Sequence, residues 1–108
     1  MPMTTKYLER EPARKDIDAL EEPTVLEFGS PWCGFCLSVQ PILAAAMEKH
    51  PGVNHLKIAD GRGRRLGRSF RVKLWPTLVF LDNGQEVTRL VRPPDTHSIS
   101  QALERIDG

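Results

Sequence analysis

The 108-residue chain holds two cysteines, Cys33 and Cys36, in the segment PWCGFC at residues 31–36. Two thiols at this spacing can close a small disulfide ring, supply half of a zinc site, or lie buried without a chemical role. We expect Cys33 between the end of a strand and the start of a helix, where a thiolate faces unpaired backbone N–H groups and the positive end of the helix dipole. Cys33 is therefore expected to attack a substrate disulfide. Cys36, one helical turn later and more buried, is expected to resolve the mixed disulfide.

Zinc binding is the main alternative for these cysteines. A C-x2-C-x13-H-x4-H pattern runs from Cys33 to His55 and fits the spacing of a Cys2His2 site. However, a Pro-Gly pair interrupts any helix that would carry both histidines, and the cysteines lie where a helical apolar face begins rather than in a hairpin. The sequence therefore favours a dithiol without metal. The histidines His50, His55 and His97 are then expected to be ordinary surface residues.

Length and composition restrict the class of protein. A chain of this length suggests one compact domain, 1–108. Its 40% hydrophobic and 27% charged residues are typical of a soluble globular protein, and a net charge of +1 indicates neither a nucleic-acid nor a membrane partner. No run approaches the ~20 apolar residues of a transmembrane helix, and segment 1–18 lacks the apolar core of a secretory signal peptide. We expect a cytoplasmic monomer. In the reducing cytosol, a cysteine pair is rarely a structural disulfide.

Hydrophobic patterning predicts the elements that must position the cysteines. Short apolar or β-branched runs indicate strands, at residues 24–28, 53–59, 77–81 and 86–91. Apolar residues at helical spacing indicate helices, at 12–20, from just after Cys33 to near His50, at 61–70, and from Asp95 or Thr96 to Ile106. The Asn83-Gly84 pair signals a two-residue turn, so the last two strands should form an antiparallel hairpin. Residues 1–23 are polar and weakly defined, with a weak strand signal near Tyr7.

This order predicts an α/β fold in which a central mixed β-sheet is flanked by α-helices on both faces. Pro41 lies inside the helix expected after the cysteines and should remove one of its backbone hydrogen bonds. Glu27 interrupts a strand that should be covered on both faces. A buried carboxylate there is expected to have a raised pKa and to accept the proton of Cys36.

Several of these segments together resemble the thioredoxin family. The resemblance rests on TVLEF followed by WCGFC, the internal Pro41, Trp75-Pro76-Thr77 and the Asn83-Gly84 hairpin, and it covers roughly residues 24 to 106. It implies a thioredoxin-like fold and an enzyme that reduces protein disulfides by dithiol–disulfide exchange. The redox group would be the Cys33–Cys36 pair itself, without an organic cofactor. The implied partners are protein disulfide substrates and a reductase or small-thiol electron donor.

The same resemblance implies roles for further residues. Pro76 would take the cis form and lie against the cysteine pair, and the backbone of Trp75 would hydrogen-bond an incoming extended peptide. Glu27 matches the position of a buried aspartate of the family, and Lys57 matches the lysine that pairs with that acid. The residues expected to line the substrate groove are Trp32, Gly34, Phe35, Trp75, Pro76 and Thr77.

The sequence also departs from the family pattern at several positions around the groove. Phe35 stands where thioredoxins have proline, Gly29 replaces an aromatic residue, and Trp75 is larger than the usual small aliphatic residue. Arg92-Pro93 replaces a glycine late in the chain. An altered docking surface is therefore expected. A disulfide oxidase or isomerase, and a non-catalytic interaction module, remain alternatives to a reductase.

A basic segment follows the second expected strand. It contains six positive residues and no acid, namely Arg62, Arg64, Arg65, Arg68, Arg71 and Lys73. Such a segment can bind nucleic acid or phosphate, or can steer acidic protein partners. We favour the simplest interpretation, in which it is the solvated face of a short helix.

Overall fold

The structure is a computed structural model that describes residues 3–107. Its helices and strands alternate along the chain as α1 (Arg14–Asp18), β1 (Thr24–Gly29), α2 (Gly34–Met47), β2 (Asn54–Ala59), α3 (Arg65–Ser69), β3 (Thr77–Asp82), β4 (Gln85–Val91) and α4 (Thr96–Glu104). The predicted order of elements is confirmed. The helices are shorter than predicted, and Pro12 lies before the N-cap Ala13 of α1 rather than at the first helical position.

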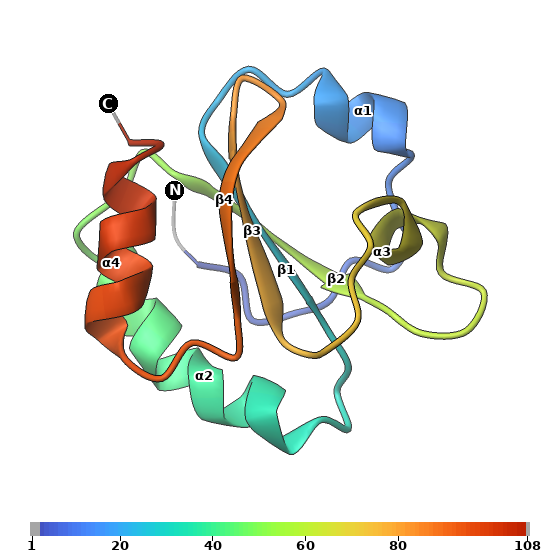
Figure 1. The fold of residues 1–108 in the computed structure, drawn as a ribbon, viewed down its shortest axis with the longest axis horizontal. Coiled ribbons are helices and arrows are strands. Elements are labelled where there is room, and N and C mark those ends of the chain that lie inside the picture. Colours follow the sequence, from blue (N-terminus) through green and yellow to red (C-terminus); the bar gives the residue numbers. More distant parts are fainter. Residues whose placement is uncertain (1–2, 108) are drawn as a thin grey trace.

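The four strands form one mixed sheet in the order β2-β1-β3-β4. β1 pairs parallel with β2 and antiparallel with β3, and β3 pairs antiparallel with β4 (Figure 1). The β3–β4 turn has positive φ at both central residues, 52° at Asn83 and 79° at Gly84. This geometry matches the twist of an antiparallel hairpin, which is why the Asn-Gly pair predicted it correctly.

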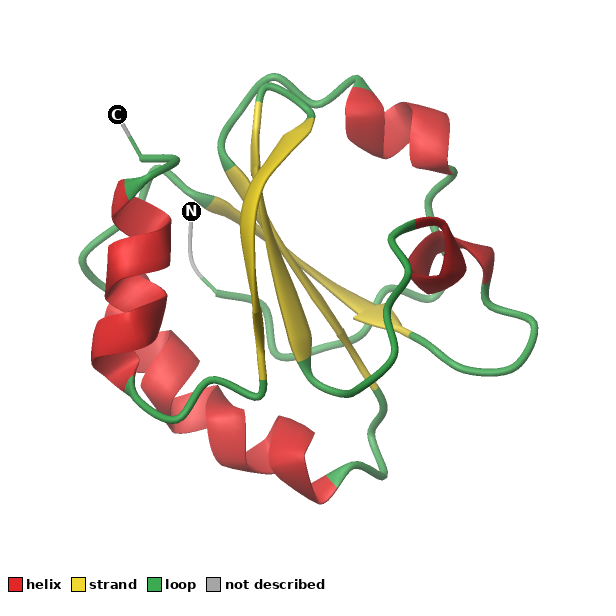
Figure 2. Cartoon of the chain, viewed as in Figure 1, coloured by secondary structure: helices red, strands yellow, loops and turns green. Residues whose placement is uncertain are grey.

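Helices cover both faces of the sheet, as expected for this α/β fold. In Figure 2, α2 and α4 lie on one side of the strands, and α1 and α3 lie on the other. Each face has its own apolar core. The core under α2 and α4 contains Val25, Val39, Leu43, Ala46, Met47, Val53, Leu78, Phe80, Ile99, Ala102, Leu103 and Ile106. The core under α1 and α3 contains Ile17, Leu26, Phe28, Ile58, Leu66, Phe70, Val79 and Leu81.

The position of β1 determines where Glu27 lies. Successive side chains of a strand point to opposite faces, so Glu27 shares the α2–α4 face with Val25, while Leu26 and Phe28 point to the other core. Every residue of β1 is buried. The carboxylate of Glu27 is therefore buried between the sheet and α2 and is shielded from solvent.

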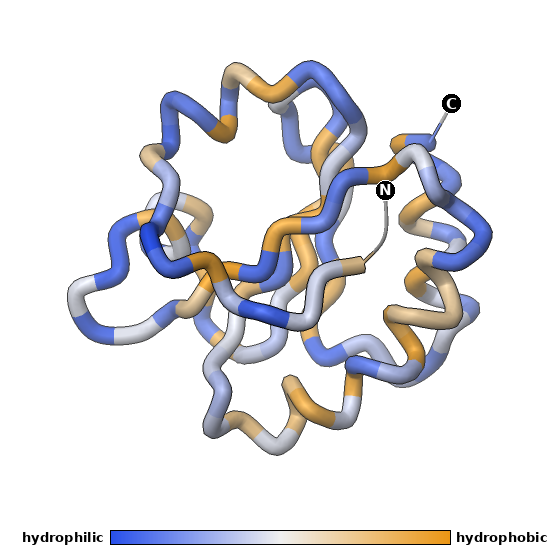
Figure 3. The backbone as a smooth tube through the Cα atoms, turned by 180° about the vertical axis from the view of Figure 1, so that it is seen from behind, coloured by the Kyte–Doolittle hydropathy of each residue, from blue (hydrophilic) through white to orange (hydrophobic). Residues whose placement is uncertain are grey.

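The N-terminal segment runs alongside β2, as Figure 3 shows from behind. The amide of Leu8 donates to the carbonyl of Lys57 at 2.9 Å, and the amide of Thr4 donates to Nδ1 of His55 at 3.0 Å. The weak strand signal near Tyr7 corresponds to this extended segment, which is not a regular strand of the sheet.

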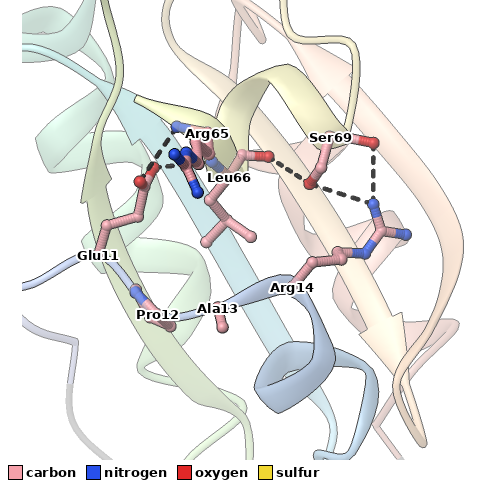
Figure 4. Close-up of a pocket in the computed structure, with 7 residues that line it drawn as sticks. All are labelled: Glu11, Pro12, Ala13, Arg14, Arg65, Leu66 and Ser69. Carbon is pink, nitrogen blue, oxygen red and sulfur yellow. Dashed lines mark hydrogen bonds between the residues drawn. The ribbon is translucent and has the colours of Figure 1, made fainter. Parts of the chain in front are cut away.

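Glu11 holds the short helix α3 in place (Figure 4). The N-cap residue of α3, Arg64, makes no side-chain capping bond. Instead, the Glu11 carboxylate accepts from the amides of Arg65 at 3.1 Å and Leu66 at 2.8 Å. A carboxylate at this position satisfies amides that the first helical turn leaves unpaired. The N-terminal residues thus contact both the edge strand β2 and the helix α3.

Candidate active site

Cys33 is the N-cap residue of α2, at the carboxyl end of β1. Its Sγ accepts a hydrogen bond from the amide of Cys36 at 3.2 Å, and both cysteines are free thiols. Cys33 is half-buried, whereas Cys36 is 2% exposed. The predicted difference in burial is confirmed. Burial and the hydrogen bond with the Cys33 thiol raise the pKa of Cys36 to about 12, so Cys36 carries its proton at neutral pH.

The loop before β3 faces the cysteine pair. The Trp75–Pro76 peptide bond is cis, as expected, and Pro76 is buried. The Sγ of Cys33 lies 3.9 Å from the carbonyl oxygen of Trp75. Thr77 is also buried, and its hydroxyl donates to the carbonyl of Leu74 at 2.6 Å.

The expected groove residues of α2 and its preceding loop lie on the surface. Trp32 is 91% exposed and Phe35 is 57% exposed, and Gly34 is exposed between the cysteines. Trp75 is half-buried, and its indole Nε1 donates to Asp60 at 2.9 Å. Large aromatic side chains that remain exposed beside a reactive thiol provide apolar surface for a docking peptide.

Arg92 lies across this surface. Its Nε donates to the carbonyl oxygen of Trp75 at 2.8 Å, and its guanidinium lies 4.1 Å from the ring centroid of Phe35. The sequence marked position 92 only as a departure from the family glycine. The structure shows that this arginine contacts two of the expected groove residues.

Behind Cys36, Glu27 is held by residues from two elements, β2 and α2. Its Oε1 lies 2.9 Å from Nε2 of His55, and its Oε2 accepts from Nε2 of Gln40 at 2.7 Å. The ammonium of Lys57 lies 3.6 Å from Oε2 and donates to Oε1 of Gln40 at 2.9 Å. Gln40 also donates to the carbonyl of Cys36 at 2.9 Å, so this network contacts the backbone of the buried cysteine.

The expected pKa shift of Glu27 is wrong in direction. Burial alone raises the pKa of this carboxyl, but the hydrogen bond from His55, the charge of Lys57 and the hydrogen bond from Gln40 together lower it below its ordinary value. The burial itself and the pairing with Lys57 agree with expectation. The prediction gave desolvation more weight than the charge of Lys57 and did not include the hydrogen bonds from His55 and Gln40, which also stabilise the ionised form.

His55 is not the ordinary surface residue that the sequence suggested. It is 4% exposed and belongs to the Glu27 network. The alternation of side chains along the second strand was the signal that could have indicated this position. His55 precedes Lys57 by two positions and must share its face, and β1 and β2 pair Glu27 with Lys57 in register.

Tyr7 is a further site residue that the sequence did not indicate. A β-carbon on Gly29 would lie 2.6 Å from Cys36 Sγ and 3.2 Å from the Tyr7 hydroxyl, so this glycine leaves room for both groups. Burial, and then the charges of Cys36, Glu27 and Cys33, raise the pKa of Tyr7 above its ordinary value. A pocket of about 320 Å³ lies here, lined by Thr5, Lys6, Tyr7, Ser30, Pro31, Cys36, Leu37 and Lys57.

The histidines of the zinc alternative have other partners. Nε2 of His55 contacts Glu27. His50 is half-buried, and its Nδ1 lies 2.5 Å from Oδ2 of Asp107. Within residues 3–107, no group of three or more His, Cys, Asp or Glu side chains is arranged to hold a metal ion. His97 is exposed, as expected.

The basic segment is not the face of one helix, which corrects the favoured interpretation. Only Arg65 and Arg68 belong to α3, and the other four residues lie in the loops on either side. Part of the segment lines a surface pocket of about 300 Å³, formed by Asp60, Gly61, Arg64, Arg68, Arg71, Val72 and Lys73.

None of the helices in residues 3–107 is both long and apolar enough to cross a membrane.

Comparisons with known proteins agree on one family. The thioredoxin family model matches residues 4–105. Thioredoxin 2 from Pseudomonas aeruginosa, in its reduced form, is 52% identical over 98% of each chain, with a TM-score of 0.87. Thioredoxin H-type 1 from Nicotiana tabacum is 37% identical over 67 residues, which are 62% of this chain and 53% of that protein. The chain therefore spans about half the length of that relative. Thioredoxin 1 from a Nostoc species is 26% identical over 77% of this chain and 78% of that protein.

Proposed function

Because the chain belongs to the thioredoxin family, we propose that it is a thiol–disulfide oxidoreductase that reduces protein disulfides through Cys33 and Cys36. One observation carries this proposal. Cys33 caps the start of α2 beside an exposed aromatic surface, while Cys36 donates its amide to the Cys33 sulfur from a buried position. An accessible thiol at a helix N-terminus with a second thiol one turn behind it is the arrangement that exchange requires.

The reaction transfers two electrons in two steps. The Cys33 thiolate bonds to one sulfur of the substrate disulfide as that S–S bond breaks, and the other substrate sulfur leaves and takes a proton. Cys36 then loses its proton and bonds to the Cys33 sulfur as the mixed disulfide breaks. The substrate leaves as two thiols, and the enzyme holds a Cys33–Cys36 disulfide. A reductase or small thiol returns the two electrons, and no organic cofactor takes part.

Removal of the Cys36 proton is the demanding step, because the pKa of this thiol is raised to about 12 in the dithiol form. Burial and the hydrogen bond and charge of Cys33 contribute to this rise. Formation of the mixed disulfide removes the contributions of Cys33, so the pKa of Cys36 should fall when its proton must leave. Glu27 remains our candidate proton acceptor. Because its pKa is lowered, it is ionised at neutral pH and would hold the Cys36 proton only transiently, with Lys57 as the neighbouring cation.

The substrate would bind as an extended peptide along Trp32, Gly34, Phe35, Trp75, Pro76 and Thr77. Trp32 and Phe35 provide exposed apolar contact area. The backbone of Trp75 lies close enough to Cys33 to align a peptide with the attacking sulfur. We further infer a cytoplasmic monomer that transfers electrons to protein disulfides.

Insulin reduction with a dithiol as electron donor tests this proposal. The wild type should turn over well above the Cys33→Ser variant. Equal rates for the two would instead favour a non-catalytic interaction module. Equilibration with glutathione then gives the redox potential. A value near about −270 mV fits a reductase, and one between about −180 and −120 mV fits an oxidase or isomerase.

A further inference from the structure

The carbonyl of Trp75 is the backbone acceptor beside the nucleophile. Its oxygen lies 3.9 Å from Cys33 Sγ and already accepts a hydrogen bond from Nε of Arg92 at 2.8 Å. An extended peptide docks on a protein by pairing its own N–H groups with exposed backbone acceptors. A peptide that pairs with Trp75 must therefore share this oxygen with Arg92 or displace it.

The backbone at position 92 aims the arginine across the groove. Arg92 has a φ of 51°, in the left-handed region that non-glycine residues rarely adopt. Its amide donates to the carbonyl of Pro76 at 2.9 Å, which fixes this backbone beside the cis peptide. The guanidinium then lies on the ring of Phe35, so the side chain connects α2 to the loop that precedes β3.

The positive charge of Arg92 has no carboxylate partner among residues 3–107. The ion pairs of these residues join other groups, and Arg92 has only the Trp75 carbonyl and the Phe35 ring. The indole of Trp75 contacts Asp60. This acid also lines the pocket formed in part by the basic residues Arg64, Arg68, Arg71 and Lys73. Positive side chains therefore lie near Trp75 in two places, at Arg92 and, beyond the acidic Asp60, in this pocket.

We propose that Arg92 is a specificity-determining residue that selects substrates with an acidic residue next to the disulfide cysteine; this inference rests on the proposed reductase function. In the free protein, Arg92 covers the Trp75 carbonyl. When an extended peptide takes that carbonyl, the guanidinium loses its hydrogen bond, and a carboxylate on the peptide replaces it with a charge-assisted one. A neutral peptide offers at most a weaker hydrogen bond without charge assistance, and a basic peptide is repelled.

Three disulfide peptides of one length test this inference, with Asp, Asn or Lys beside the cysteine. For the wild type, kcat/KM should be about fivefold to tenfold higher for the Asp peptide than for the Lys peptide, and the ratio should fall with added salt. Arg92→Gly should reduce the ratio to about twofold or less and raise kcat/KM for the Asn peptide, because the Trp75 carbonyl is then open. Arg105→Ala removes one exposed positive charge after α4 and should keep the wild-type ratio.

Binding without turnover separates this inference from the proposed function. The same peptides with serine in place of cysteine can be titrated against the fluorescence of Trp32 and Trp75, the two tryptophans of the chain. The Kd values should rank Asp, Asn, Lys in the wild type and converge in Arg92→Gly, even if reduction were absent. An unchanged Asp-to-Lys ratio in Arg92→Gly, or an equal loss on all three peptides, would overturn the assignment.

Discussion

His55 Nε2 lies 2.9 Å from Glu27 Oε1, and both side chains are fully shielded from solvent. The other ring nitrogen of His55 accepts a hydrogen bond from the amide of Thr4 at 3.0 Å. A nitrogen that accepts carries no proton, so this pairing selects the neutral tautomer with the proton on Nε2. His55 is therefore an uncharged donor to the Glu27 carboxylate, and Lys57 supplies the balancing charge.

Replacement of His55 by alanine should destabilise the protein. The variant leaves the buried Glu27 Oε1 and the half-buried Thr4 amide without a partner, which costs about 2–3 kcal/mol of the free energy of unfolding. Urea denaturation measures this loss. The matched control is His97→Ala, since His97 is exposed, and its effect should stay within about 0.5 kcal/mol. Equal stabilities of the two variants would contradict the role of His55 in the network.

Glu27→Gln should destabilise the protein in a pH-dependent way. Glutamine leaves Lys57 buried without its counter-charge, and the loss of one partner of a buried pair typically costs about 3 kcal/mol. The pKa of Glu27 is lowered in the folded state. Its stabilising contribution is therefore complete above the unfolded pKa of about 4.3 and is lost as the pH falls through the folded pKa.

Denaturation of the wild type and Glu27→Gln at several pH values checks this expectation. The difference in unfolding free energy should be constant near neutral pH and should shrink below about pH 4.3. Glu86→Gln breaks the exposed Glu86–Arg89 pair and should change stability by less than about 1 kcal/mol. A difference between wild type and Glu27→Gln that grows toward acid would show that the pKa of Glu27 is raised instead.

Gly29→Ala should crowd the buried cysteine. The added β-carbon would lie 2.6 Å from Cys36 Sγ and 3.2 Å from the Tyr7 hydroxyl, and neither contact can be kept without movement. Overpacking of this kind costs about 1–3 kcal/mol, and displacement of Cys36 should also slow resolution of the mixed disulfide. Thermal unfolding and stopped-flow kinetics measure the two effects. Gly34→Ala is the control for stability, because a β-carbon there meets nothing within 4 Å.

The sequence predicted the fold because its signals are local. Asn83-Gly84 determines a turn by its own backbone preferences, and the residues of each strand alternate or run continuously according to burial. Cys33 and Cys36 were likewise identified by spacing and by their place after a strand. The Glu27 network was predicted only in part, because its donors come from distant segments. Thr4 and His55 are 51 positions apart, and no local pattern joins them.

The position of Arg92 shows the same limit at the groove. The substitution of the family glycine was visible, but the direction of the side chain depends on a left-handed backbone and on contacts with Phe35 and Trp75. Tyr7 was missed because its segment lacks the pattern of a strand. Its contact with the Cys36 pocket depends on the pairing of Leu8 with β2.

The two cysteines should differ strongly in alkylation. With a pKa of about 12, only roughly one Cys36 thiol in ten thousand is ionised at pH 8, and its side chain is buried. Iodoacetamide at this pH should therefore modify Cys33 alone in the reduced protein, as peptide mass spectrometry can show.

In Cys33→Ser, the thiol of Cys33 no longer contributes to the raised pKa, while burial still does, so the pKa of Cys36 should fall but stay above the ordinary value of about 8.5. The alkylation rate of Cys36 in this variant should rise with pH. Its midpoint should lie between the ordinary thiol pKa of about 8.5 and the wild-type value of about 12. A midpoint at or below the ordinary value would mean that burial does not protect Cys36, and that the proton acceptor assigned to Glu27 is not needed.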